Sequence, residues 1–130
     1  MQQKKTLATE ADVALLVEAF YTKAKPDPVI GHFFTEVKQI DWAHHIPVIV
    51  SFWDSMLFGS RSYRGNPMEK HMALDTLSRI EPAHFARWLS LWKETVDEYF
   101  EGDKAEESKR RAEGIAGLMQ VKVQAQRGSV

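Results

Sequence analysis

The chain has 130 residues, of which 17 are basic, 18 are acidic and none is cysteine. About 130 residues can form one domain with a sizeable core, so we expect a single domain over 1–130 with frayed tails at 1–8 and 124–130. The net charge of −1 favours neither nucleic acid nor an anionic membrane as a partner, and the lack of cysteine excludes disulfides, thiolate metal sites and iron–sulfur clusters.

The first part of the chain has no apolar signal region behind its basic residues, and no window approaches the roughly 18 apolar residues of a membrane span. We therefore expect a cytoplasmic protein. Apolar residues recur at steps of three and four over 13–24, which predicts an amphipathic helix. Thr9, three residues before Asp12, provides a start signal, and Asp27 followed by Pro28 predicts the cap and first turn of a short helix.

A second long helix is predicted in "DWAHHIPVIVSFWDSMLF", where the apolar residues repeat with the helical period behind a cap at Asp41. Pro47 should bend this helix or mark an irregular first turn. The following "GSRSYRGNP" has the composition of a loop, and Asn66 with Pro67 is expected to open a short helix that carries His71.

The clearest amphipathic pattern is "HFARWLSLWKETVDEYF", which predicts a third long helix that ends at Gly102. Asp103 with Glu106 resembles a capping box at the start of a last helix. No alternating run reaches convincing strand length, so the sequence predicts an all-α fold in which amphipathic helices cover one another as a sandwich or bundle.

Polar side chains point toward the core from each of the three long helices. Tyr21 lies on the apolar face of the first, His45 shares a face with Ile49 and Phe52 in the second, and Trp88 lies on the core face of the third. Each one alone is more often satisfied by a local carbonyl or a water molecule. Together they are also what a small polar ligand would need inside an apolar pocket.

The remaining histidines give weaker signals. His44 points about 100° away from its neighbour on a helix and is assigned to solvent. His32 and His84 have no partner at metal-ligand spacing, so a structural or exposed role is favoured. His71 belongs to a partly apolar short helix, and periodicity alone favours an ordinary histidine over a ligand. No HExxH, GxGxxG, P-loop or GxSxG motif is present.

Four segments in order, "AFYTKAKPDPVIGHFF", "DWAHHIPVIVSFW", "YRGNPMEKH" and "HFARWLSLW", resemble the motifs of the group III truncated haemoglobins. The resemblance covers roughly residues 10 to 120. It implies a two-over-two helical sandwich around a non-covalent haem b. The absence of a Gly-Gly pair, which the other truncated groups usually carry, also favours group III.

By this resemblance, His71 after the "YRGNP" loop is the expected proximal iron ligand. The expected distal residues are Tyr21, His45 and Trp88. Other side chains expected around the haem are Phe34, Ile49, Phe52 and Trp53. Tyr63 and Arg64 could reach the haem propionates, or they could form a solvated loop pair.

The resemblance further implies that a five-coordinate iron binds dioxygen or another diatomic ligand. Inward donors should retain oxygen strongly, which favours oxygen or nitric oxide chemistry, or sensing, over transport. A nitric oxide dioxygenase or a peroxidase would need a reductase as partner, because the chain has no flavin or nicotinamide motif. A haem-free helical interaction module is the alternative that explains the same apolar faces.

Overall fold

The computed structural model describes residues 4–35, 41–60 and 80–128. Within these ranges the chain is almost entirely helical, as the sequence predicts. Its elements are β1 (Lys5–Thr6), α1 (Glu10–Ala24), α2 (Gly31–Thr35), α3 (Trp42–Phe58), α5 (Pro82–Tyr99), β2 (Phe100–Glu101) and α6 (Asp103–Gly128).

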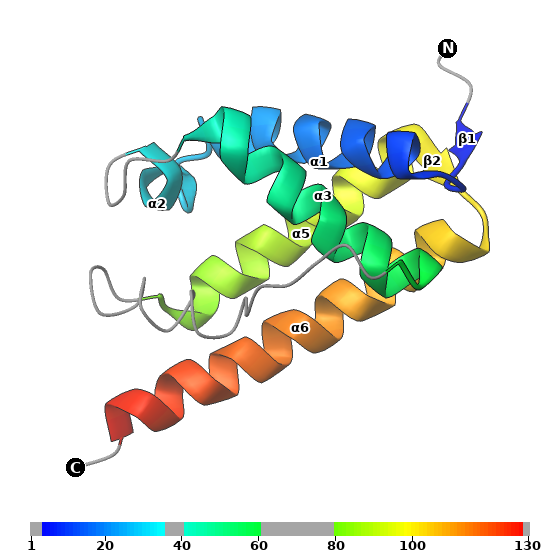
Figure 1. Cartoon of the computed structure of the whole chain (residues 1–130). Helices are drawn as coiled ribbons and strands as arrows, with labels where there is room; N and C mark the ends of the chain where they lie inside the picture. The colour runs from blue at the N-terminus through cyan, green and yellow to red at the C-terminus, as the bar shows by residue number, and fades with distance from the viewer. Residues whose placement is uncertain (1–3, 36–40, 61–79, 129–130) are drawn as a thin grey trace.

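The long helices are arranged in two layers. Helix α1 packs against α3, α5 packs against α6, and α1 also contacts α5, which joins the layers. Figure 1 shows α1 and α3 crossing in the upper layer, with α5 and α6 below them. Because each helix is apolar on the side that meets its neighbours, the core lies between the two layers.

Helix α1 begins at the cap that the sequence predicts. The hydroxyl of Thr9 accepts a hydrogen bond from the amide of Asp12 at 3.2 Å, and Oδ2 of Asp12 accepts one from the amide of Thr9 at 3.1 Å. This reciprocal pair satisfies amide groups that the first turn of a helix leaves without partners.

Helix α3 continues through Pro47 without a break in its assignment. Asp41 occupies the N-cap position with extended backbone angles, but its side chain makes no cap hydrogen bond. The helix ends at Gly59, whose φ of 73° lies in the left-handed region that favours glycine.

The turn between α1 and α2 depends on Asp27. Its Oδ2 accepts hydrogen bonds from the amides of Val29 at 3.0 Å and Ile30 at 3.1 Å, so the predicted cap is present, although the helix itself begins later, at Gly31. A β-carbon at Gly31 would lie 2.4 Å from the carbonyl oxygen of Lys25. Only glycine allows α2 to lie this close to the end of α1.

The tails expected to be frayed, 1–8 and 124–130, fall within the described residues over 4–8 and 124–128. At the N-terminal end, β1 pairs in parallel with β2, and Leu7 is buried in the core. At the other end, α6 continues to Gly128. Two-residue strands are too short to show a period in sequence, which explains why β1 and β2 were not predicted. No helix in the described ranges has both the length and the apolar character that a membrane span requires.

Candidate functional site

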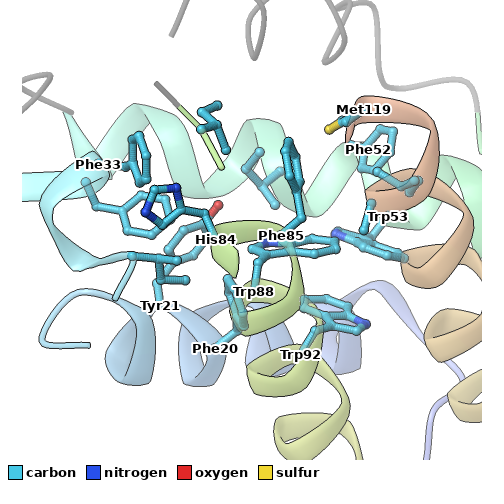
Figure 2. Close-up of a pocket in the computed structure, with 16 residues that line it drawn as sticks. Phe20, Tyr21, Phe33, Phe52, Trp53, His84, Phe85, Trp88, Trp92 and Met119 are labelled. Carbon is cyan, nitrogen blue, oxygen red and sulfur yellow. The ribbon is translucent and has the colours of Figure 1, made fainter. Parts of the chain in front are cut away.

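A partly open apolar pocket lies between the two layers, with walls from α1, α2, α3, α5 and α6. Figure 2 shows Phe33, Tyr21 and His84 toward one end of it and Trp53, Phe52 and Met119 toward the other. Its lining residues are mostly aromatic or aliphatic: Phe20, Tyr21, Ile30, Phe33, Phe34, Ile49, Phe52, Trp53, Ile80, His84, Phe85, Trp88, Trp92, Ile115, Ala116 and Met119. The arrangement suits a flat apolar ligand.

Tyr21 supplies a hydroxyl to the wall of this pocket. The residue is buried, and burial raises the pKa of its phenol well above the usual value, so it stays protonated as a donor. Among the described residues no hydrogen bond to this hydroxyl is found. The ring is nevertheless fixed by edge contacts, with centroid distances of 5.4 Å to Phe34 and 5.8 Å to His45.

Trp88 lines the same pocket and is half-buried. Its ring lies 6.2 Å from that of Phe20 and is nearly parallel to that of Trp92, at 6.3 Å. Trp92 in turn stacks on Trp53 with centroids 4.4 Å apart. The indole Nε1 of Trp92 is buried without a hydrogen-bond partner in the described part of the chain. Three nearly parallel indole rings therefore form one wall of the pocket.

The structure brings together most of the site residues that the sequence singles out within the described ranges. Tyr21 and Trp88 line the pocket, and the other predicted residues on its walls are Phe34, Ile49, Phe52 and Trp53. Both Phe33 and Phe34 contribute, from the short helix α2.

His45 does not line the pocket. Its ring centroid lies 5.8 Å from that of Tyr21 and 5.5 Å from that of Trp42, so His45 contacts a lining residue without being one itself. His44 is exposed, in agreement with its assignment to solvent.

His84 is a pocket residue that the sequence analysis missed. Its Nδ1 accepts a hydrogen bond of 2.8 Å from the amide of Glu81, as part of the capping box of α5. An accepting Nδ1 means that the neutral ring carries its proton on Nε2. The spacing held a signal, because His84 lies four residues before Trp88 and so shares its helix face.

The predicted residues Tyr63, Arg64 and His71 lie outside the described residues. Their assignments stay predictions. Within the described ranges, no cluster of three or more histidine, cysteine, aspartate or glutamate side chains is placed to hold a metal ion.

Comparison with known proteins points to the same family as the four sequence motifs. No protein-family model matches the chain. A curated relative from Campylobacter jejuni, described as group 3 truncated hemoglobin ctb, is 29% identical over 114 residues, covering 85% of this chain and 87% of the relative. The crystal structure of a group III truncated hemoglobin from Campylobacter jejuni matches with a TM-score of 0.81 and 28% identity, covering 93% of this chain and 95% of that one.

Both similarities extend over most of the length of the proteins compared. One is a similarity of sequence, and the other is a similarity of fold as well. The chain is therefore similar to the group III truncated haemoglobins in both sequence and fold.

Proposed function

We propose that the chain binds haem b without a covalent link in the pocket between its two layers. The globin-type relatives and the aromatic walls of the pocket support a haem-binding role. His71, identified by the "YRGNP" motif that precedes it, would supply the iron ligand. When bound, haem iron offers a coordination position to a diatomic ligand such as oxygen, carbon monoxide or nitric oxide.

The chemistry of the pocket fits this cofactor. A macrocycle has two large apolar faces, and the stacked indoles and phenylalanines supply matching flat surfaces. The cavity has a volume of about 130 Å³, less than that of most ligand pockets. The open side of the pocket would leave the polar groups of a larger ligand accessible to water.

On the ligand side of the haem, Tyr21 and Trp88 would be the hydrogen-bond donors. The Tyr21 hydroxyl is the observation that carries this part of the proposal, because it is buried, protonated and unbonded among the described residues. Because Tyr21 lines the cavity, its hydroxyl is available as a donor to a bound ligand. A polar ligand atom in the cavity would satisfy it, and the same hydrogen bond would slow the escape of that ligand.

We further propose oxygen or nitric oxide chemistry, or sensing, at a five-coordinate iron, in place of bulk transport. Oxygen that is held strongly is better suited to react at the iron than to be carried and released. Turnover would require electrons from a reductase. The comparisons do not favour a haem-free interaction module. The cytoplasmic location stays a prediction.

The proposal is tested by absorption spectra of the purified chain and of His71→Ala, in ferric, ferrous and carbonyl forms. We expect a Soret band in the wild type and its loss or a strong shift in His71→Ala. The control is His44→Ala, which removes an exposed imidazole and should keep the wild-type spectrum. A colourless wild-type protein that takes up no added haem would contradict the proposal.

A further inference from the structure

Trp42, the first residue of α3, joins three elements around Tyr21 without touching the pocket. Its ring lies 5.0 Å from that of Tyr21 on α1, 6.2 Å from that of Phe34 on α2 and 5.5 Å from that of His45 on its own helix. Trp42 is not a lining residue of the cavity. Any effect of Trp42 on a bound ligand must therefore pass through its neighbours.

Lys25 completes this arrangement from the solvent side. Its Nζ lies 4.0 Å from the centroid of the Trp42 ring, which is the geometry of a cation–π contact. The backbone amide of Lys25 donates to the carbonyl of Tyr21 at 3.0 Å, at the C-cap of α1. One residue thus connects the end of the helix that carries Tyr21 to the start of the helix that carries His45.

At the start of α3, aromatic contacts replace the side-chain hydrogen bond that usually holds the first turn of a helix. The Asp41 side chain makes no cap hydrogen bond, so it does not fix the first turn of α3. The Tyr21 hydroxyl has no hydrogen bond in the described part of the chain that would orient it. The direction of this hydroxyl therefore depends on the rings that enclose it, and Trp42 is the one that also contacts Phe34 and His45.

We propose that Trp42, held by Lys25, is a positioning residue that fixes Tyr21 and His45 relative to each other and so aims the Tyr21 hydroxyl into the cavity. This inference rests on the proposed function for its effect on a ligand. The positioning itself is a property of the chain.

The first test therefore needs no ligand kinetics. In the full-length chain with labelled tyrosine and histidine, nuclear Overhauser contacts between the rings of Tyr21 and His45 are measured, in the diamagnetic carbonyl form if haem is bound. The chain has 3 tyrosines, and Tyr21→Phe identifies the signal. We expect the contact in the wild type, its loss in Trp42→Leu and its retention in Trp42→Phe, which keeps a flat ring.

The second test is the rate of oxygen dissociation. An aromatic contact of this kind changes an equilibrium by roughly 2- to 10-fold, so Trp42→Leu should speed dissociation by about that factor. The double variant with Tyr21→Phe should be no faster than Tyr21→Phe alone, because Trp42 acts through Tyr21. Lys25→Met, which removes the cation but keeps the chain length, should change the rate in the same direction by less.

Phe58→Leu is the matched control. Phe58 also lies on α3, is partly buried and has a lysine above its ring, since Nζ of Lys104 is 5.8 Å from its centroid, but it does not line the pocket. It should leave both measurements unchanged. If Trp42→Leu fails to fold, Trp42→Phe and Lys25→Met carry the test.

The inference is overturned if the contact between Tyr21 and His45 and the oxygen rate are the same in Trp42→Leu as in the wild type. It is also overturned if the effects of Trp42→Leu and Tyr21→Phe multiply, since that would mean independent action. If the wild type takes up no haem, the proposed function fails, while the Overhauser contacts still decide whether Trp42 positions Tyr21.

Discussion

The guanidinium of Arg87 on α5 holds the buried carboxylate of Asp27, with Nε at 2.9 Å and Nη2 at 2.7 Å from Oδ1. Asp27 also caps the turn that leads to Ile30 and α2, and Arg87 directly precedes Trp88. This ion pair therefore ties two walls of the pocket together.

The same contacts make Asp27 a pH-sensitive element of the fold. Burial alone would raise the pKa of its carboxyl, but the hydrogen bonds from Arg87 and from the amides of Ile30 and Val29 outweigh it, so the pKa is lowered. A lowered pKa in the folded state gives stability that is present above the ordinary value of about 3.9 and is lost as the pH falls through the folded value.

We therefore expect Asp27→Asn to lower the free energy of unfolding at pH 7 by about 1–3 kcal/mol, measured by urea denaturation. The difference from the wild type should shrink as the pH falls below about 4, where the carboxyl is protonated in the unfolded chain, and should vanish below the lowered pKa of the folded chain. Glu107→Gln is the control. It breaks helix-surface ion pairs with Lys104 and Arg111 and should change stability by less than about 1 kcal/mol. A constant difference at all pH values would contradict the account.

Gly31 offers a second test of the α2 wall. In Gly31→Ala the new methyl group would lie 2.4 Å from the carbonyl oxygen of Lys25, so the backbone must move. We expect a loss of about 1–3 kcal/mol in the free energy of unfolding, from overpacking. The matched control is Gly117→Ala in α6, where nothing lies within 4 Å of the added carbon. Alanine in a helix should stabilise there by roughly 0.5–1 kcal/mol, and equal effects at both positions would rule out the packing argument.

Features that depend on neighbouring residues in the sequence could be predicted, whereas contacts between residues far apart in the sequence could not. Tyr21 and Trp88 could be predicted because the helical period alone turns them toward the core. The pair of Asp27 with Arg87 spans 60 residues, and no local pattern signals it. For His84 the sequence favours a structural or exposed role over metal ligation, but the partner of its capping contact and its place in the pocket appear only in the fold. The pocket position of a residue thus follows from periodicity, but its polar partners depend on tertiary packing.

His45 shows a related limit. The helical period places the His45 ring on the same face of α3 as Ile49 and Phe52, but periodicity cannot tell whether an inward ring reaches a cavity. Because the His45 ring contacts Tyr21 but does not line the pocket, we expect His45→Leu to change oxygen dissociation by less than Tyr21→Phe does. Stopped-flow measurement of both variants checks this order. A larger effect of His45→Leu would mean that His45 contacts the ligand directly.

Tyr21→Phe is the most direct test of the ligand side of the pocket. The substitution removes only the hydroxyl and keeps the ring that packs against Phe34, so the pocket should keep its shape. A hydrogen bond to a polar ligand atom in a dry pocket is worth roughly 1.5–3 kcal/mol, which corresponds to about 10- to 100-fold faster oxygen dissociation. Tyr99→Phe is the control, because that half-buried phenol is not a lining residue and should leave the rate unchanged.

Carbon monoxide accepts hydrogen bonds weakly, so its dissociation should change much less than that of oxygen. If both ligands left Tyr21→Phe faster by the same factor, the hydroxyl would be acting through the shape of the pocket and not through a hydrogen bond.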